Sequence, residues 1–475
     1  MLTLNEEEKS KLKNCFGTRH LQFFLLFITL LIVNGQRTCL SVAIIAMTEK
    51  IPPEPSIITY PQWTNTDTIL SSFFWGYLAT QTVGGQLGEH FGPKWFLVGT
   101  TILGSVCNVL IPILAQSWGS TGVIICRVVQ GLSQGFLLPS THILISRWTP
   151  LYERTTVTNV VYSGMSLGVV TSMMFTGAIA ESKLGWPHAF YILGFAGIAC
   201  GIILGFFGVN SPSLHKNIST DERNYIESSN SVSQKEKVPT PWRSILTSLP
   251  VWAILVSSCG ENWGTFTLLT EIPSFLSNIM NFDINSNGHL SALPYLVTFF
   301  VSFVPPLIAD RLISSKTLSI GTTRKIFNSI GMFVPGLALF VLGFVDGTQK
   351  VTAVALLVVA VAASSFLNAG EFVNMIDVAP NHTGTILGLT NGSGQLFSIL
   401  APLTVGFFGN DKTELILWRK VFWLTTGIYF STGLFYAIFA SGEVQTWNDL
   451  ENNNSESRNE DRGKEKVEGT RDIVE

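Results

Sequence analysis

The chain has 475 residues, of which 47% are hydrophobic and only 13% are charged, whereas an ordinary soluble domain carries about 25% charged residues. Because this small number of polar side chains cannot cover a water-facing surface, we expect the apolar residues to face lipid. The net charge of −3 argues against nucleic acid as a partner. The six cysteines form no CxxC pair, which argues against a zinc site or a disulfide framework.

Apolar stretches long enough to cross a bilayer recur along the whole chain. A spanning helix needs about 20 mostly apolar residues. We predict an all-α membrane protein with twelve such helices, near residues 21–47, 67–88, 95–115, 119–147, 156–180, 188–209, 250–279, 287–309, 324–345, 351–376, 383–409 and 418–441. The first stretch has no small-residue cleavage site and is predicted to remain as a span rather than to be a signal peptide.

The distribution of lysine and arginine predicts the orientation of these helices. If the N-terminus is cytoplasmic, 21 of the 29 basic residues fall in inner segments and six in outer segments. This excess of positive charge inside is typical of membrane proteins. Both termini are therefore predicted to be cytoplasmic, which also requires an even number of spans. The two remaining basic residues, Arg37 and Arg127, lie inside predicted spans.

The longest polar interruption separates the sixth span from the seventh and divides the chain into two sets of six helices. It is rich in Ser, Lys and Glu, and we expect one helix in it, near residues 219–229, capped by Ser219 or Thr220. The predicted organisation is a cytoplasmic N-tail (1–20), a first six-helix bundle (21–209), a cytoplasmic linker (210–249), a second six-helix bundle (250–441) and a disordered cytoplasmic C-tail (442–475).

An internal repeat supports this division. The segment GGQLGEHFGPK (84–94) follows the second span, and PPLIADRLISSK (305–316) follows the second span of the other half. Each is a turn of small residues followed by an acidic-basic pair, Glu89-His90 in one and Asp310-Arg311 in the other. Duplicated halves are a common plan for transporters, whose substrate site then lies near the midplane between the halves.

The first of these loops resembles the signature of the major facilitator superfamily, with Glu for the usual Asp and His for the usual Arg. Further stretches along nearly every span resemble the organic and inorganic anion cotransporters, a group that includes vesicular glutamate transporters, sialin and type I sodium-phosphate cotransporters. They are GQRTCLSVAIIAM (35–47), FFWGY (73–77), RVVQGLSQG (127–135), GENWGTFTLLTEIPSF (260–275), NMIDVAP (374–380), NGSG (391–394) and FYAIFASGE (435–443). The form of span seven is most similar to the inorganic phosphate cotransporter branch.

This resemblance implies a fold of two bundles that rock against each other to give alternating access. It also implies that the loop residues latch neighbouring helices in one state. The gating residues implied in this way are Gly85, Glu89, Gly92, Lys94, Asp310 and Arg311.

Arg37 and Arg127 are the main candidates for substrate binding. At 1.5 Å per residue, Arg37 lies about 24 Å into the first span from inside, and Arg127 lies about 12 Å into the fourth from outside. Each costs at least about 2.5 kcal/mol to place deep in a helix. A guanidinium stays charged and binds phosphate or carboxylate through two hydrogen bonds, so the pair predicts an anion site. The alternatives are an internal salt bridge or a side chain that snorkels to the surface. In the resembled family both positions carry arginine.

Three acidic residues and one glutamine bear on how transport is driven. Glu261 lies near the middle of span seven, where it could bind Na⁺, accept a proton, or pair with one of the two arginines. Glu371 and Asp377 are interpreted as gate or helix-end charges near the inner end of span ten. Gln134 replaces a glutamate of proton-coupled relatives, and because glutamine cannot titrate, this replacement argues against proton coupling through span four.

Other polar residues complete the predicted site. Tyr77 lies near the middle of span two, where its hydroxyl could contact the substrate or simply pack, and in the family this tyrosine lines the cavity. Asn391 and Gln395 share one face of span eleven and suit Na⁺ or substrate hydrogen bonds, although bonds between helices are equally consistent. Asn374 is a similar candidate.

No enzyme motif is present, neither a Walker loop nor HExxH nor GxSxG, and we expect no catalytic activity and no cofactor. We predict Na⁺-coupled symport of inorganic phosphate at the plasma membrane by a monomer, with the lipid bilayer and a small anion as its partners. The alternative is proton-coupled transport of an organic anion such as sialate or another carboxylate in lysosomes or vesicles. A third possibility is a channel-like anion conductance or a receptor that does not transport.

Overall fold

A computed structural model describes residues 17–50, 57–150, 154–231, 240–380, 382–409 and 411–449. The predicted N-tail and C-tail lie mostly outside these ranges. The described residues form helices joined by turns, with no strand among them. The helices of the first half are α2 (Thr18–Met47), α3 (Thr66–Phe91), α4 (Pro93–Gln134), α5 (Leu137–Trp148), α6 (Arg154–Glu181) and α7 (Trp186–Phe207).

The second half follows after a polar segment that contains three short helices. These are the 3₁₀ helix η2 (Pro212–Leu214), α8 (Thr220–Ser231) and α9 (Trp242–Thr247). The helices of the second half are α10 (Leu249–Asn278), α11 (Ile284–Val301), α12 (Val304–Ser314), α13 (Ile320–Leu342), α14 (Lys350–Ser364), the 3₁₀ helix η3 (Ser365–Ala369), α15 (Glu371–Val378), α16 (Thr383–Phe408) and α17 (Leu415–Phe439). A last 3₁₀ helix, η4 (Thr446–Asp449), follows α17.

Twelve spans can be traced through the described residues. The label α4 covers two of them, because the chain reverses at Gly119, whose φ of 61° lies in the left-handed region that favours glycine. Hydrogen bonds between the two limbs, such as the one from the Cys126 thiol to the Cys107 carbonyl, show that the limbs run antiparallel. The eighth span is α11 with α12, and the tenth is α14, η3 and α15.

Hydropathy alone identifies most of these spans. Eight helical stretches are long and apolar enough to cross a membrane, and one of them, Pro93–Trp148, holds two spans. The three spans that fall short by this measure are α3, α10 and α16. These three helices meet where the halves face each other, since α3 packs against α16 and α10 packs against α2 and α16. Polar residues in them therefore face the interior of the protein rather than lipid.

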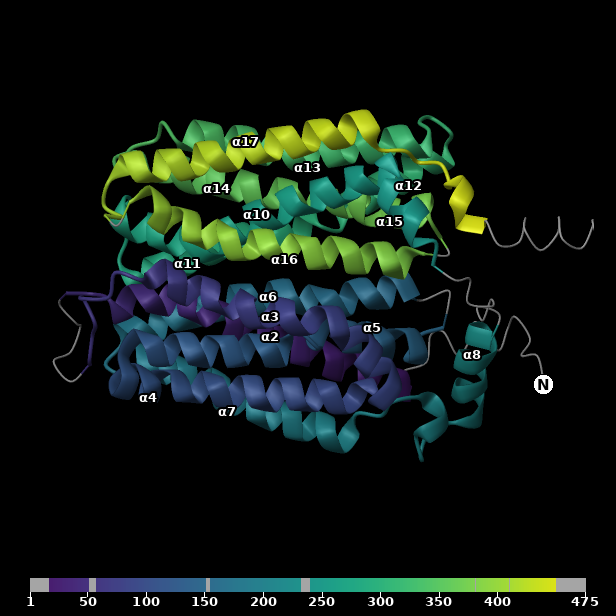
Figure 1. Cartoon of the computed structure of the whole chain (residues 1–475). Helices are drawn as coiled ribbons and strands as arrows, with labels where there is room; N and C mark the ends of the chain where they lie inside the picture. The colour runs from purple at the N-terminus through teal and green to yellow at the C-terminus, as the bar shows by residue number, and fades with distance from the viewer. Residues whose placement is uncertain are drawn as a thin grey trace, which may run out of the picture.

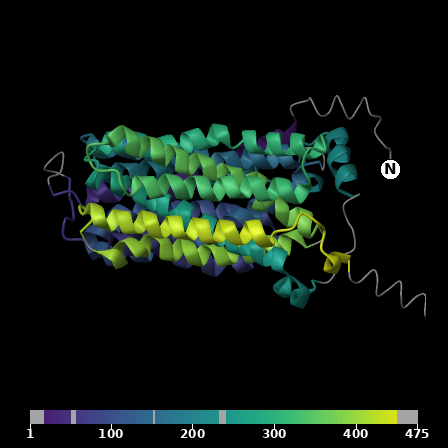
Figure 2. The same cartoon turned by 90° about the horizontal axis from the view of Figure 1, so that it is seen from above.

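The two halves lie side by side with their helices roughly parallel (Figure 1; Figure 2). Across the boundary, α6 packs against α11 and α3 against α16. A single core cluster crosses it as well, joining Val169 and Met173 of the first half to Phe275 and Leu339 of the second. The halves are therefore held together by packed side chains in addition to the chain connection.

One end of the molecule carries the start of α2, α8 and the end of α17 (Figure 1). The helix predicted near residues 219–229 is present there as α8, and its Ser219 hydroxyl accepts a hydrogen bond from the Glu222 amide at 3.2 Å, as an N-cap does. The Glu222 carboxylate in turn accepts hydrogen bonds from the first amides of α2, at Thr18 (3.1 Å) and Arg19 (3.0 Å). The segment between the halves is thereby fixed to the first half. We call this end the inner end, following the predicted orientation.

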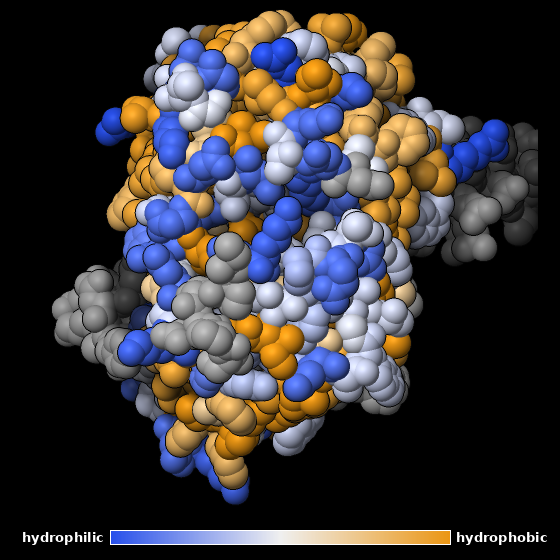
Figure 3. Space-filling model, turned by 90° about the vertical axis from the view of Figure 1, so that its left-hand side faces the viewer, coloured by the Kyte–Doolittle hydropathy of each residue, from blue (hydrophilic) through white to orange (hydrophobic). Residues whose placement is uncertain are grey.

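The opposite, outer end is polar and the flanks are apolar. Figure 3 looks onto the outer end, where hydrophilic residues gather, while hydrophobic residues surround them on the sides of the bundle. Large apolar side chains on the flanks are widely exposed, and Phe206 and Phe407 keep 81% and 85% of their surface accessible. Such exposure suits contact with lipid rather than with water.

Candidate anion site between the two halves

The Arg37 guanidinium is enclosed by aromatic rings. Its Cζ atom lies 4.8 Å from the ring centres of Phe73, Phe74 and Phe266, and 5.2 Å from that of Tyr77. Three of these rings come from α3, and Phe266 comes from α10 in the other half. The Nε and Nη2 atoms of Arg37 are buried and make no hydrogen bond in the part of the chain that the structure describes. The rings attract the positive charge but satisfy none of its hydrogen-bond donors.

Arg127 lies beside Arg37 and shares one of its rings. Its Cζ atom lies 4.9 Å from the centre of the Phe73 ring, so the two guanidinium carbons are at most about 10 Å apart. Arg127 donates a hydrogen bond of 2.9 Å to the Gln130 side-chain oxygen and a longer one, 3.4 Å, to the Arg37 carbonyl. Arg127 is only 3% exposed, and its Nε has no acceptor among the described residues.

No carboxylate neutralises either arginine within the described residues. Glu261, considered above as a partner, instead accepts hydrogen bonds from Asn262 (3.1 Å) and Thr265 (3.2 Å). A salt bridge between Glu261 and either arginine, considered above as an alternative, is therefore absent among the described residues. Two buried like charges are costly to hold together unless an anion joins them. The free guanidinium N–H groups of the two arginines are donors of the kind that bind phosphate or carboxylate.

Tyr77 lies where an anion-site residue should lie. It is 3% exposed and stacks on Phe73 with ring centres 5.6 Å apart. The ring cluster of Phe73, Phe74 and Tyr77 is completed by Phe266 of α10 and Ile399 of α16, so side chains from both halves close around Arg37. Tyr77 therefore lies beside Arg37, and its predicted contact with a bound solute stays a prediction.

The polar candidates of α16 lie further toward the inner end. Gln395 and Asn391 precede Ile399 by one and two helical turns, or about 6 and 12 Å along the axis. Gln395 is buried, and its side-chain oxygen accepts no hydrogen bond from the described residues, whereas Asn391 is half-buried. Gln134 is also buried, with its amide nitrogen against Gly104, and the hydrogen bonds of Arg127 go to Gln130 and to the Arg37 carbonyl instead.

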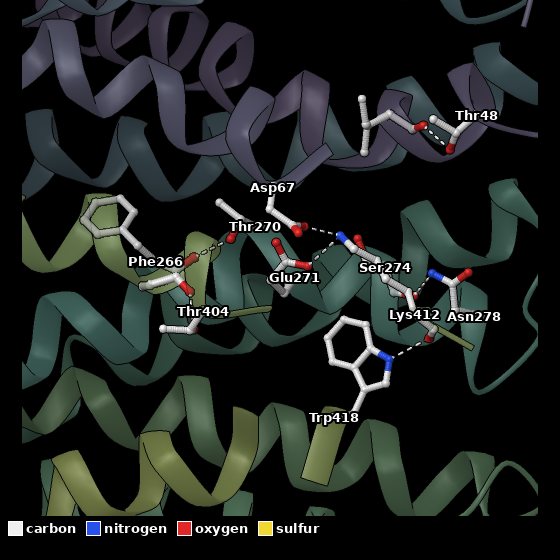
Figure 4. A network of polar contacts seen from close by, with 12 residues as sticks. Thr48, Asp67, Phe266, Thr270, Glu271, Ser274, Asn278, Thr404, Lys412 and Trp418 are labelled. Atoms are coloured by element: carbon white, nitrogen blue, oxygen red, sulfur yellow. Dashed lines mark hydrogen bonds and ion pairs between the residues drawn. The ribbon is translucent and has the colours of Figure 1, made fainter. Parts of the chain in front are cut away.

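The outer end above the arginines is closed by a charged bridge between the halves. The Lys412 ammonium lies 2.5 Å from an Asp67 oxygen of α3 and 3.6 Å from a Glu271 oxygen of α10 (Figure 4). Asp67 also lies against Gly406 of α16, where an added Cβ would be 2.6 Å from a carboxylate oxygen and would displace it. All three charged side chains are largely buried, with exposures of 17% for Lys412, 9% for Asp67 and 2% for Glu271.

The loop around Lys412 is shaped by local hydrogen bonds. The Asp411 carboxylate accepts from the hydroxyl (2.6 Å) and the amide (2.9 Å) of Thr413, which turns the chain and lowers the pKa of Asp411. The Trp418 indole donates to the Lys412 carbonyl at 2.8 Å. Lys412 is therefore held in position from both sides of the loop (Figure 4).

Further contacts between the halves also lie toward the outer end. The Ser71 hydroxyl of α3 donates to the Ile399 carbonyl of α16 at 3.0 Å. Gly177 of α6 and Gly288 of α11 approach so closely that a Cβ on either would lie 3.0 Å or less from the partner backbone. These contacts place the arginines beneath a closed outer end, as in one state of a protein that opens alternately to its two sides.

Comparison with known proteins agrees with this arrangement. The family model described as "Major Facilitator Superfamily" matches residues 26–402. A Drosophila melanogaster protein named "Putative inorganic phosphate cotransporter" is 34% identical over 94% of this chain and 89% of its own length. Human "Sialin" is 33% identical over 91% of each chain, and "Vesicular glutamate transporter 3" of Danio rerio is 35% identical over 93% of this chain and 76% of its own.

The chain belongs to the major facilitator superfamily. Within the superfamily, its relatives form the anion cotransporter group that the sequence motifs indicated. Solved structures show the same fold at low identity: a D-xylose-proton symporter matches with a TM-score of 0.69 and 13% identity over 88% of this chain and 97% of its own. A bacterial homologue of the lysosomal transporter Spinster matches with a TM-score of 0.64 and 14% identity over 88% and 96% of the two chains. The predicted two-bundle fold of twelve helices is confirmed.

The superfamily signature loop connects α3 and α4. For Gly85 and Glu89 only the backbone helix is described, and their side chains lie outside the described residues. Gly92 ends α3 with a φ of 94°, in the left-handed region that favours glycine, and the Lys94 amide donates to the Asn210 side chain at 2.9 Å. Asp310 and Arg311 are exposed on α12. Their latching role stays a prediction.

Two acidic residues of span ten lie in unlike surroundings. Asp377 forms an ion pair with Arg324 of α13 at 2.7 Å, in keeping with a helix-end charge. Glu371 stands at the first position of α15, so it is also at a helix end, but it forms no ion pair among the described residues. Its side chain is 0% exposed because span ten is interrupted by η3 and Gly370, which brings Glu371 into the interior at the start of α15.

Several residues of the site were not singled out from the sequence. Phe73 and Phe74 belong to the FFWGY motif, and their spacing from Tyr77 by four and three residues places all three on one side of α3, a signal that could have been used. Gln130 follows Arg127 by three residues, a spacing that permits its hydrogen bond. Phe266 and Lys412 had no local signal, because their partners lie far away in the sequence.

Proposed function

We propose that this transporter carries a small anion by alternating access, with Na⁺-coupled symport of inorganic phosphate as its reaction. The observation that carries the proposal is the pair of half-buried Arg37 and buried Arg127, whose guanidinium groups have buried free donors and no acidic partner among the described residues. A tetrahedral anion with several acceptor oxygens suits two such groups, because each guanidinium can donate two parallel hydrogen bonds. The relative named as a phosphate cotransporter supports this choice.

The charged bridge at the outer end supplies a means of gating. Lys412 and Glu271 belong to the second half and Asp67 to the first, so the pair between Lys412 and Asp67 must break when the halves separate on the outer side. Opening there exposes the arginines to the outer solution, and closing returns the site to the inner side. Transport then follows from rocking of the two halves, as in other carriers built from repeated halves.

The membrane address and state of assembly are part of the same proposal. The distribution of lysine and arginine supports cytoplasmic termini, and the ends of the described chain, at Thr18 and beyond α17, lie at one end of the molecule (Figure 1). We place the protein in the plasma membrane. Because both halves needed for an alternating site are in one chain, a monomer suffices.

A second candidate is proton-coupled transport of an organic carboxylate. The aromatic rings around Arg37 favour it, since they could bury the apolar part of an organic anion. The relatives named sialin and vesicular glutamate transporter point the same way. Gln134 argues against proton coupling through span four, because an amide does not titrate.

Uptake by purified protein in liposomes tests these proposals. We expect labelled phosphate to accumulate at least about tenfold more under an inward Na⁺ gradient than under a matched K⁺ gradient. The variant Arg37→Ala should abolish this uptake, and Arg243→Ala, which removes an exposed arginine from α9, should leave it unchanged. Phosphate uptake that is equal under the Na⁺ and K⁺ gradients would contradict the symport. Carboxylate uptake driven by a pH gradient would favour the second candidate. Anion currents that do not saturate would indicate a channel instead.

A further inference from the structure

Three buried oxygen atoms on one side of α15 have no hydrogen-bond donor. They are both carboxylate oxygens of Glu371 and the side-chain oxygen of Asn374, and none accepts a hydrogen bond from the described residues. Both residues are 0% exposed. They are three positions apart in a helix, so their side chains project from the same face.

The groups around these atoms favour a cation as their ligand. The amide nitrogen of Asn374 is already used in a 2.8 Å hydrogen bond to the Tyr436 hydroxyl, which fixes the Asn374 oxygen in its orientation. The Ser257 hydroxyl accepts a hydrogen bond from the Asn328 amide at 3.0 Å and donates a longer one, 3.4 Å, to the Asn328 side-chain oxygen. All three unsatisfied atoms are acceptors, and one group is a carboxylate, so only a positive charge compensates the site fully.

Protein cations near the site are committed elsewhere. Arg324 pairs with Asp377 at 2.7 Å and donates to the Ala369 carbonyl at 2.9 Å, and no lysine or arginine in the described ranges forms an ion pair with Glu371. Glu261 lies one helical turn after Ser257 on α10, and α10 packs against α15, which carries Glu371. Two carboxylates near each other in a buried place increase the need for a positive ion.

The backbone adds a feature found at ion sites of transporters. Span ten is discontinuous: the 3₁₀ helix η3 ends at Ala369, and α15 begins after Gly370. Gly370 lies so close to α13 that an added Cβ would be 2.9 Å from the backbone nitrogen of Asn328. Interrupted helices of this kind leave carbonyl groups and helix ends free to bind Na⁺ within the membrane.

From these observations we propose that Glu371 and Asn374, with Glu261 beside them, form the binding site of a sodium ion in the second half of the transporter. Oxygen ligands that include a carboxylate suit a hard cation. This inference rests on the proposed function, since it locates the coupling ion of the symport. It adds Glu371, which carries the charge, to the sequence-based candidates Glu261 and Asn374.

The site is linked to the anion site through α10. Glu261 precedes Phe266, one of the rings around Arg37, by five residues, or about 7.5 Å along the helix axis. A sodium ion bound between Glu371 and Glu261 therefore acts on the same helix that encloses the arginine. The bound cation and anion stabilise the same position of α10, so each raises the affinity for the other.

Binding of ²²Na⁺ to the purified full-length protein, without any anion, tests the site. The wild-type protein should bind ²²Na⁺ saturably, in competition with unlabelled Na⁺ but not with choline. Glu371→Gln should weaken the apparent affinity at least about tenfold, and Asn374→Leu should weaken it less. Glu443→Gln removes an exposed carboxylate after α17 by the same chemical change and should bind like wild type.

A second measurement guards against a variant that fails to fold. The melting temperature of the wild-type protein should rise when choline chloride is replaced by sodium chloride, and this rise should disappear in Glu371→Gln and in Asn374→Leu. Wild-type sodium affinity in both variants overturns the proposal. So does an absence of sodium binding to the wild-type protein, including the case in which Glu371 takes up a proton instead. Sodium binding lost in Glu371→Gln, together with failure of phosphate uptake, leaves the sodium site standing and removes only phosphate as the substrate.

Discussion

Phe73 presents its ring to both arginines of the candidate site. The ring is fully buried in α3, and the Arg37 and Arg127 guanidinium carbons lie 4.8 and 4.9 Å from its centre. The ring thus brings two like charges close together without neutralising them. Attraction to an aromatic face contributes about 0.5–2 kcal/mol, too little to offset the burial of a full charge. A bound anion, as proposed above, would supply the remaining stabilisation.

Gln130 is the residue that fixes the direction of Arg127. It is fully buried, accepts from Arg127 at 2.9 Å, and donates to the Gly104 carbonyl at 3.4 Å. Gln130→Leu leaves a buried guanidinium nitrogen without an acceptor, so we expect a loss of about 1–3 kcal/mol in stability. Phosphate affinity should fall about tenfold, as measured by titration calorimetry. Gln349→Leu, at an exposed position before α14, serves as the control. Unchanged stability and affinity in Gln130→Leu would mean that Gln130 does not position Arg127.

At the scale of single elements, α10 connects three separate functions. Glu261 lies beside the proposed sodium site, Phe266 packs on Arg37, and Glu271 belongs to the outer bridge. They are spaced five residues apart, or about 7.5 Å of rise for each step. Because α10 also packs against both α2 and α16, a small displacement of this helix would move Glu261, Phe266 and Glu271 together. The helix is therefore a physical connection between ion binding and gating.

The outer bridge makes a prediction for the conformational equilibrium. Lys412→Met removes the ammonium that joins Asp67 to Glu271 and leaves two buried carboxylates facing each other, so the outer end should open more often. A cysteine introduced at Ser71, which bonds to α16 beneath the bridge, should then react at least about fivefold faster with a membrane-impermeant thiol reagent.

The matched control for this prediction exchanges the charges. In the double variant Asp67→Lys, Lys412→Asp an ion pair between the halves can form again, and labelling should return toward the rate without Lys412→Met. Equal labelling in all of these variants would show that the bridge does not hold the outer end closed.

At the scale of the whole molecule, hydropathy and charge predicted the framework well. The twelve spans and the helix near residues 219–229 follow from patterns of apolar and polar residues that are apparent within each short stretch of sequence. Arg37 and Arg127 stand out for the same reason, since a charged residue within an apolar stretch can be identified from the sequence alone. The structure also places their guanidinium groups against the same ring, that of Phe73, which their depth in the membrane did not specify.

Features that depend on contacts between distant segments could not be predicted in this way. Lys412 looked like an ordinary loop charge because its partner Asp67 lies 345 positions away. The burial of Glu371 could not be predicted, because hydropathy does not reveal the break at Gly370, where the chain lies close to α13. Sequence patterns identify the helices, whereas the faces that these helices turn to one another are decided by packing.

Phosphate binding to purified variants tests the central claim, that Arg37 and Arg127 together form an anion site, most directly. Phosphate should raise the melting temperature of the wild-type protein and of Arg243→Ala in proportion to its concentration. In Arg37→Ala and in Arg127→Ala the phosphate concentration needed for half of this effect should rise at least about tenfold. In the double variant no effect of phosphate should remain. A double variant that is still stabilised by phosphate as strongly as the wild-type protein would contradict the account.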